Sequence, residues 1–319
     1  MRRLAEWMRW GLPIVTSLGI VAYILQKVNR ADLWRALTGV RLEWVMLAVT
    51  LYVAGQALSS IKWALLGRSV GLAGSLVEYG RFYFIGMFFN LLGFSTLGGD
   101  AVRALYLGRG RRPGLALSSV VFDRVSGLAV LMAMGSVALL AYPEYEFPGP
   151  LGTVIIAGGL ALVVGWWFCP RLVRLLPAHN RIRRQVETEL APFWRDRVLL
   201  LRVSAVSVVF HLSQVCVQWV LTKAVGATIP FSYCLVFHPM LSVMMALPSI
   251  SGFGVREGGY IYFLGRIGVD ASIALTLGLL WWAVTVIAGL LGGVLFLAGG
   301  ARLPTLSVRG EEHEASAVG

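Results

Sequence analysis

Charged residues are scarce in this sequence. Asp, Glu, Lys and Arg make up 14% of its 319 residues and hydrophobic residues 57%, whereas a soluble domain usually has about 25% charged residues. Apolar runs of about 20 residues recur, each long enough to cross about 30 Å of hydrocarbon as a helix. Backbone groups in lipid must pair within the segment, and the alternating pattern of a membrane β-barrel is absent. We therefore predict an all-α polytopic membrane protein, built as a helical bundle.

Cysteines and sequence motifs of enzymes are also scarce. The three cysteines (Cys169, Cys216 and Cys234) are odd in number and have no metal-ligand spacing, which argues against a disulfide framework and a metal site. The sequence has no G-x-x-x-x-G-K-[ST] loop, no G-x-S-x-G turn and no H-E-x-x-H helix, the patterns of ATP binding, serine hydrolysis and zinc proteolysis. We expect no cofactor, no metal, no ATPase in this chain and no catalytic residue.

Acidic residues are fewer than basic ones, 16 against 28, for a net charge of +12. In a membrane protein this excess indicates cytoplasmic loops and contact with anionic lipid headgroups, so we expect no nucleic-acid partner. The segment 170–202 holds eight arginines, whereas the loop at 142–150 has two glutamates and no base. We therefore predict a protein of the inner (cytoplasmic) membrane, with its N-terminus in the cytoplasm. The basic residues between the first two spans fall outside in this topology, where an interfacial helix would turn Leu33, Trp34 and Leu37 towards lipid.

The hydropathy pattern divides the chain into spans and broken regions. We place spans at 11–27, 43–66, 114–142, 150–169, 200–224 and 271–299, the first being a retained helix and not a cleaved signal peptide. Two further apolar regions, 79–108 and 232–268, are interrupted by proline and glycine, and we predict a broken or re-entrant helix pair in each. One transmembrane domain would cover 1–305, with a polar tail at 306–319.

The two broken regions resemble each other. Residues 94–109 read "FSTLGGDAVRALYLGR", and residues 248–266 read "PSISGFGVREGGYIYFLGR". Gly98 and Gly252 are 154 residues apart, and Gln56 and His211 are 155 apart. This offset predicts an inverted-topology repeat, with copies at about 30–145 and 185–300.

The glycines predict sites where a new helix begins inside the membrane. A helix starting just after Gly98 and Gly99 would offer free backbone N–H groups to an anion, with Asp100 as its cap and Arg103 one turn later. The second region offers a similar set: Gly252, Gly254, Arg256 and Glu257. The alternative is that the glycines allow close helix packing and the charges form local ion pairs.

Polar residues also interrupt two full spans. Asp123 and Arg124 are adjacent, so they point about 100° apart on a helix, and each should meet a partner elsewhere, for instance Asp123 with Arg103; the alternative is a pair that extends towards the interface. On the fifth span a polar stripe includes His211, Gln214 and Gln218. These residues line a headgroup cavity in one interpretation and form interhelical hydrogen bonds in the other.

Three ordered motifs carry a family resemblance. "GGDAVRALYL", "VVFDRVSGL" and "PSISGFGVREG" resemble segments of the lysylphosphatidylglycerol synthetase transmembrane family, the flippase-like half of multiple peptide resistance factors, over about residues 10–300. The resemblance implies handling of modified lipids, and we expect a stand-alone member without the aminoacyltransferase domain of the bifunctional proteins. Ser95 and Thr96 stand where the family pattern leads us to expect a proline.

The leading hypothesis is a lipid translocase for an anionic or modified headgroup, not an enzyme. Arg103 and Arg256 would hold the phosphate in a polar cavity formed by the two broken helix pairs. One alternative is an accessory subunit that binds a lipid-biosynthesis enzyme. The other is a membrane-embedded transferase with Asp100, Asp123 or Glu257 as general base.

Overall fold

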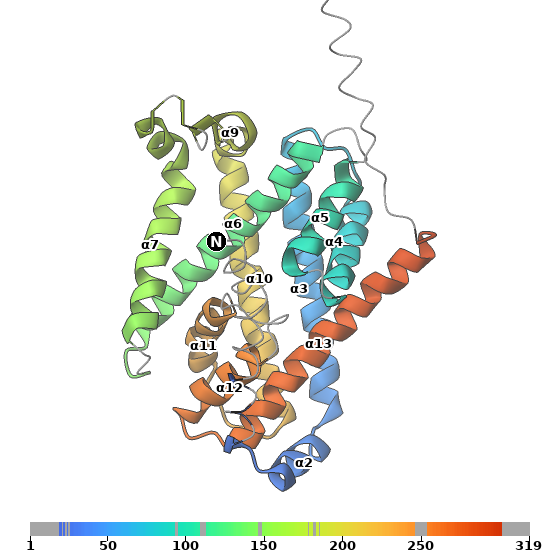
Figure 1. The fold of residues 1–319 in the computed structure, drawn as a ribbon, viewed down its shortest axis with the longest axis vertical. Coiled ribbons are helices and arrows are strands. Elements are labelled where there is room, and N and C mark those ends of the chain that lie inside the picture. Colours follow the sequence, from blue (N-terminus) through green and yellow to red (C-terminus); the bar gives the residue numbers. More distant parts are fainter. Residues whose placement is uncertain are drawn as a thin grey trace, which may run out of the picture. The chain divides into compact units, whose positions relative to one another are not determined.

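The computed structural model describes most of the chain as helix. It covers residues 19–20, 22, 24, 26–92, 95–108, 113–145, 149–177, 179–180, 183–184, 186–245 and 254–301, with the side chains of 95–97, 188–189 and 192 excepted. Every regular element within these ranges is a helix (Figure 1), which confirms the all-α prediction.

Five of the helices in the described part of the chain are long and apolar enough to cross a membrane. They confirm a multi-pass membrane protein, and the five predicted spans after the first match them within a few residues. At 1.5 Å per residue, a 28-residue helix such as α3 reaches about 42 Å, well beyond the hydrocarbon core. The predicted first span at 11–27 lies largely outside the described residues. The five are α3 (Leu42–Ser69), α6 (Pro113–Ala141), α7 (Gly149–Leu172), α10 (Arg197–Ala224) and α13 (Ala271–Ala298).

Each predicted broken region contains two short helices. The first holds α4 (Leu76–Leu91) and α5 (Ser95–Gly108), and the second holds α11 (Phe231–Met244) and α12 (Val255–Gly265). The longest, α4, has 16 residues, about 24 Å of helix, which is less than the thickness of the hydrocarbon core. The remaining elements are α2 (Arg30–Thr38), η1 (Val173–Leu175), η2 (Val186–Leu190) and α9 (Ala191–Arg195).

The chain forms two compact units, and the five long helices contribute residues to both. Unit 1 comprises residues 1–53, 132–159 and 211–286, and it includes α11 and α12. Unit 2 comprises residues 54–131, 160–210 and 287–319, and it includes α4 and α5. Each unit is described below by itself.

Glycines bring the helices of unit 2 close together. Helices α4 and α5 lie side by side (Figure 1), and the backbone N–H of Gly99 donates to Asn90 Oδ1 at 3.0 Å. A Cβ at Gly99 would meet the carbonyl oxygen of Gly86, and one at Gly292 in α13 would meet that of Phe84 in α4. Small residues at such contacts let two helix backbones approach each other.

An aromatic cluster fixes the orientation of α6 in unit 2. The Phe122 ring stacks on Phe193 at 4.5 Å and contacts Trp166 and Trp194, each at 4.7 Å between centroids. Asp123 follows Phe122 in the chain and points about 100° away around the helix. Because Phe122 packs against α7 and α9, Asp123 faces other helices that pack against α6, namely α3 and α5.

In unit 1, aromatic residues join α11 to α12. The Tyr233 hydroxyl donates to the carbonyl oxygen of Phe263 at 2.6 Å. Phe237 lies 5.0 Å from Tyr260 and 5.8 Å from Phe263, ring centroid to ring centroid, in edge-on geometry. Each such pair adds about 0.5–1.5 kcal/mol beyond its area burial, so these contacts hold the two short helices together.

The helix predicted between the first two spans is present. Asn29 Oδ1 accepts from the Ala31 N–H at 2.9 Å and caps α2, as is typical of an N-terminal asparagine. No residue of α2 is buried, and Trp34 is 69% exposed. Contact of this helix with lipid stays a prediction.

The glycine contacts give a stability prediction. Gly292→Ala should lower the melting temperature of the purified protein by several degrees, because forcing a methyl group against the Phe84 carbonyl costs roughly 1–3 kcal/mol. Gly165→Ala in α7 is the matched control, since its Cβ would meet nothing within 4 Å. A thermal unfolding series followed by size-exclusion fluorescence compares the two. Equal stability of both variants would contradict the close approach of α13 to α4.

Candidate functional site

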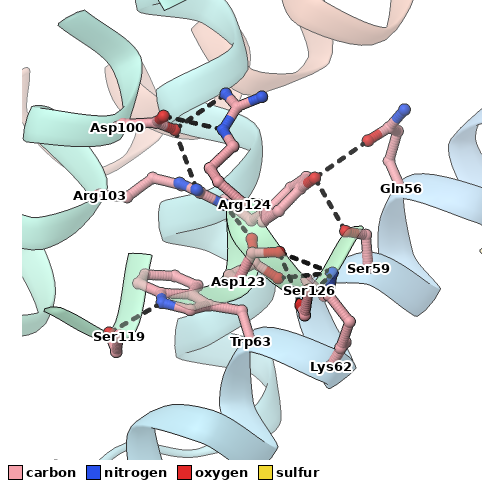
Figure 2. A network of polar contacts seen from close by, with 12 residues as sticks. Gln56, Ser59, Lys62, Trp63, Asp100, Arg103, Ser119, Asp123, Arg124 and Ser126 are labelled. Atoms are coloured by element: carbon pink, nitrogen blue, oxygen red, sulfur yellow. Dashed lines mark hydrogen bonds and ion pairs between the residues drawn. The ribbon is translucent and has the colours of Figure 1, made fainter. Parts of the chain in front are cut away.

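Five ionisable side chains form a connected network in unit 2 (Figure 2). They come from three helices that are far apart in the sequence, and they alternate in charge along the chain of contacts. In order of contact they are Lys62 of α3, Asp123 of α6, Arg103 and Asp100 of α5, and Arg124 of α6.

Asp123 lies between two cations. Lys62 Nζ is 3.0 Å from Asp123 Oδ1, and Arg103 Nη1 is 3.5 Å from Asp123 Oδ2, with all three side chains at most 5% exposed. Lys62 also donates to the backbone oxygen of Asp123 at 3.0 Å and to Ser126 Oγ at 3.3 Å. Burying an isolated ion costs several kcal/mol, so each of these charges depends on its partners for a place inside the protein.

Asp100 joins the two arginines. Its Oδ1 is 2.9 Å from Arg103 Nη2, one turn along α5. Arg124 grips it through two bonds, from Nε to Oδ2 at 2.8 Å and from Nη2 to Oδ1 at 3.0 Å. This planar, two-bond geometry is the one that a guanidinium also forms with phosphate.

Two aromatic rings hold the Arg103 guanidinium. Its central carbon lies 5.0 Å from the Trp63 ring and 4.7 Å from the Tyr83 ring, within the range of cation–π attraction. The rings are themselves fixed, because Trp63 Nε1 donates to Ser119 Oγ at 3.1 Å and the Tyr83 hydroxyl donates to Ser59 Oγ at 3.0 Å. Arg103 is therefore at the centre of the network, because two carboxylates contact the ends of its guanidinium and two aromatic rings lie beside it.

The network carries an excess of positive charge. Three cations and two carboxylates sum to +1. Four of its side chains are at most 11% exposed, but Arg124 is 51% exposed. The excess charge is thus accessible at Arg124, where an anion would balance it.

The sequence predicted part of this network. The proposed pairing of Asp123 with Arg103 is confirmed, and Asp123 and Arg124 meet different partners as their angular separation required. Lys62 was missed, although it is the one ionisable residue in the stretch "GQALSSIKWALLG" at 55–67. A lone charge in an apolar span is a strong signal of a buried partner, and it would have found this residue.

The prediction for the first glycine pair is wrong. Helix α5 begins at Ser95, so Gly98 and Gly99 lie inside it and Asp100, its sixth residue, is not its cap. The physical reason is that Gly99 serves close packing against Gly86 and donates its N–H to Asn90. The glycine pair that we interpreted as a helix start therefore lies at a contact between α4 and α5. Binding of a substrate by these residues stays a prediction.

The prediction for the second helix start is confirmed. Helix α12 begins at Val255, directly after Gly254, whose φ of +85° is accessible mainly to glycine. Glu257 Oε2 accepts from the Gly254 N–H at 2.9 Å, and its Oε1 is 2.5 Å from Arg256 Nη2. Arg256 and Glu257 are both buried and neutralise each other. Gly252 lies outside the described residues.

The polar stripe of α10 is buried in unit 1. His211, Gln214 and Gln218 are 7%, 4% and 4% exposed, and the His211 ring lies 6.0 Å from the ring of His238 in α11. The stripe therefore faces protein and not lipid. Its role as a cavity lining stays a prediction.

The buried pairing gives a double-mutant prediction. Asp123→Asn should destabilise the protein by roughly 3–5 kcal/mol, because it leaves buried cations without their counter-charge. Adding Lys62→Met removes one of those cations, so the double variant should be more stable than Asp123→Asn alone. Thermal unfolding of the wild type, both single variants and the double variant measures the coupling. Purely additive losses would show that Lys62 and Asp123 do not interact.

Comparison with known proteins connects this site to a family. No curated protein matches the chain. The family model described as "Lysylphosphatidylglycerol synthase TM region" matches residues 10–293, a range that includes the whole charge network and both pairs of short helices. Because the match covers most of the sequence, the chain belongs to the lysylphosphatidylglycerol synthase transmembrane family.

Proposed function

We propose that this chain is a membrane lipid translocase, without an ATPase of its own, that binds an anionic headgroup at the charge network of unit 2. The observation that carries the proposal is the net charge of +1 on a mostly buried network whose one exposed side chain is an arginine. Ionisable groups at membrane depth usually lie on a substrate or ion pathway. Membership of a lipid-related membrane family supports the same conclusion.

The charge of the network suits a phosphodiester. Such a group carries one negative charge, which would neutralise the excess of one positive charge. A phosphate oxygen pair would bind Arg124 in the same fork geometry that the Asp100 carboxylate now occupies. Arg103, which has protein partners on its ends and faces, would hold Asp100 and Asp123 in position and would not contact the lipid first.

Exchange of one anion for another lowers the barrier to headgroup movement. Taking a phosphate out of water without a partner is very costly, and leaving Arg124 without one would add a further cost. If the phosphate replaces Asp100 at Arg124 as Asp100 shifts towards Arg103, every charge keeps a partner throughout. The reverse exchange, in which Asp100 returns to Arg124, releases the lipid, so the headgroup does not stay bound.

The helix bounds support an inverted repeat with re-entrant helix pairs. Helices α3 and α10 both have 28 residues, and their first residues, Leu42 and Arg197, differ by 155. The first residues of α4 and α11, Leu76 and Phe231, differ by 155 as well. An odd number of spans between the copies would make them enter from opposite faces, as in many transporters. In this proposal Arg256 and Glu257 take part in the second copy.

The transport prediction concerns Arg124. Arg124→Gln should slow the transfer of a tail-labelled anionic phospholipid in proteoliposomes by roughly 10- to 150-fold, since a charge-assisted hydrogen bond is worth roughly 1.5–3 kcal/mol. The transfer rate of Arg124→Lys should lie between those of the wild type and Arg124→Gln, because lysine keeps the positive charge but cannot form the two-bond guanidinium contact. Arg35→Gln is the control, as Arg35 is 77% exposed on α2 and pairs only with nearby Asp32 among the ion pairs described there.

The same vesicles separate the alternatives. Wild type that moves the lipid unchanged supports a translocase, whereas a change in lipid mass would indicate a transferase. Wild type that does neither would leave an accessory role beside a lipid-biosynthesis enzyme. Normal transfer by a folded Arg124→Gln variant would remove this residue from the proposed site.

A labelling experiment tests the proposed topology in the inner membrane, with a cytoplasmic N-terminus. In a background without the three native cysteines, Glu144→Cys should react in intact cells with a maleimide that cannot cross the inner membrane. Arg195→Cys should react only after the membrane is opened, because the arginine-rich segment is placed in the cytoplasm. Both positions are exposed, so access differs only by side. The opposite pattern would reverse the orientation.

A further inference from the structure

Exposed arginines gather where α7 ends and α10 begins, within unit 2. The segment 170–202 has eight arginines against three acidic residues, a net charge of +5. Five of these arginines are exposed and are called the arginine surface below: Arg171 of α7, Arg174 of η1, Arg195 of α9, and Arg197 and Arg202 of α10. The charge network around Arg124 does not include any of them.

Tertiary contacts bring the elements of this surface together. Trp194 Nε1 in α9 donates to the carbonyl oxygen of Trp166 in α7 at 2.5 Å. Arg197 Nη1 donates to the carbonyl oxygen of Trp167 at 3.2 Å, and its guanidinium carbon lies 5.8 Å from the Trp167 ring. Trp166 Nε1 in turn donates to Ser204 Oγ of α10 at 3.0 Å. The end of α7 therefore lies against the first turns of α10, so the arginines share one region of unit 2.

The acidic side chains that the structure describes in this segment have partners within the protein. Glu187 Oε1 pairs with Arg183 Nε at 3.0 Å. Asp196 Oδ1 accepts from the N–H groups of Val198 and Leu199 at 2.8 and 3.0 Å and caps α10. Among the described residues, no salt bridge involves the arginine surface. An anion from outside the chain would balance its charge.

Exposed apolar side chains lie between the arginines. Each of the following is next in the chain to an arginine of the surface: Leu172 (43% exposed), Leu175 (82%), Val198 (53%) and Leu201 (57%). A basic surface with exposed apolar side chains is typical of segments that lie in the membrane interface. A nucleic acid would pair with the charges only, whereas a lipid offers a phosphate to the arginines and covers the apolar side chains with its tails.

The position of Arg202 favours a lipid over a soluble acidic partner. Helix α10 has 28 residues, a length of about 42 Å. When centred on about 30 Å of hydrocarbon, it extends about 6 Å beyond each side. Arg202 lies five residues, or about 7.5 Å, from the start of the helix, at the boundary between headgroups and tails. An arginine at this depth is costly without a counter-charge, and its long side chain reaches the lipid phosphates.

From these observations we infer that the arginine surface is a binding site for the phosphate groups of anionic membrane lipids, separate from the network at Arg124. A guanidinium grips a phosphate through two parallel hydrogen bonds, and the apolar side chains beside the arginines contact the lipid tails. The inference does not rest on the proposed function, because these lipids are held at the surface of unit 2 whether or not the chain moves a lipid.

Lipid binding by the purified protein tests the inference. All measurements use the Arg124→Gln background, so that the proposed substrate site does not contribute. Native mass spectrometry counts the short-chain lipids that the protein retains and gives their dissociation constants. The protein should bind phosphatidylglycerol about fivefold more tightly for each arginine that contacts it, compared with phosphatidylcholine of the same tails and no net charge. Equal affinities would overturn the inference.

Three substitutions place the binding at this surface. Together, Arg174→Gln, Arg195→Gln and Arg202→Gln should weaken phosphatidylglycerol binding by about 100-fold, since each arginine near an anionic surface contributes about fivefold. Binding of phosphatidylcholine should not change. Arg171 and Arg197 are left in place because each also lies over an aromatic ring. Full binding of phosphatidylglycerol by the folded triple variant would contradict the inference.

A charge-matched variant is the control. Lys27→Gln, Arg30→Gln and Arg35→Gln together remove three exposed positive charges from unit 1, so the net charge falls by the same amount. This variant should keep most of the affinity for phosphatidylglycerol. Equal losses in the two triple variants would attribute the binding to net charge alone and overturn the inference.

A single substitution separates binding from folding. Arg202→Gln alone should weaken phosphatidylglycerol binding about fivefold. The melting temperature of the lipid-free protein should not change, because Arg202 is exposed. A clearly lower melting temperature would assign Arg202 to the fold, and unchanged binding would remove it from the site; either result would contradict the inference.

Two competitors identify the source of the anion. Inorganic phosphate at millimolar concentration and polyglutamate should each fail to displace phosphatidylglycerol, because neither covers the exposed apolar side chains. Displacement by phosphate would indicate a site for a free anion, and displacement by polyglutamate a site for an acidic protein. Either result would overturn the assignment to lipid. Because no step measures lipid transfer, failure of the proposed translocase would leave this site standing, and loss of this site would leave the translocase proposal untouched.

Discussion

The pairing of Asp123 with Lys62 and Arg103 is the interaction on which the rest of unit 2 depends. One buried carboxylate balances cations from two other helices, and it thereby fixes how α3, α5 and α6 face one another. Because a buried charge without a partner costs several kcal/mol, a rotation of any of these helices would break a pair and be opposed. Lipid tails are as apolar as leucine, so burying apolar side chains between helices gains little over contact with lipid, and the charge pairing adds to the orientation that the aromatic cluster gives α6.

The two units carry different polar chemistry. Unit 2 holds a charged network whose excess charge reaches the surface at Arg124. Unit 1 holds one self-neutralised pair, Arg256 with Glu257, and the buried, uncharged side chains His211, Gln214 and Gln218 of α10.

Glycine has two different roles in the paired short helices. At Gly254 it supplies a positive φ, which lets α12 begin directly after it. At Gly99 it supplies the missing Cβ, which lets α5 approach the backbone of Gly86 in α4. The sequence shows a glycine pattern in both regions, but the pattern does not distinguish a turn from a contact. The distinction matters for function, since only a helix that starts at the glycine presents its first N–H groups there.

The sequence by itself determined the membrane class, the positions of five spans and the two broken regions, because these follow from the length and composition of local apolar runs. It also predicted that Asp123 would meet Arg103, since a buried charge needs an opposite one. The tertiary structure alone decided that Lys62 completes the pairing, that α5 starts at Ser95, and that Arg124 is the exposed cation. Those facts depend on which helix faces meet and how deeply each side chain is buried. Facing and burial arise from contacts between residues far apart in the sequence, such as Lys62 and Asp123 at 61 positions, and a local pattern does not encode them.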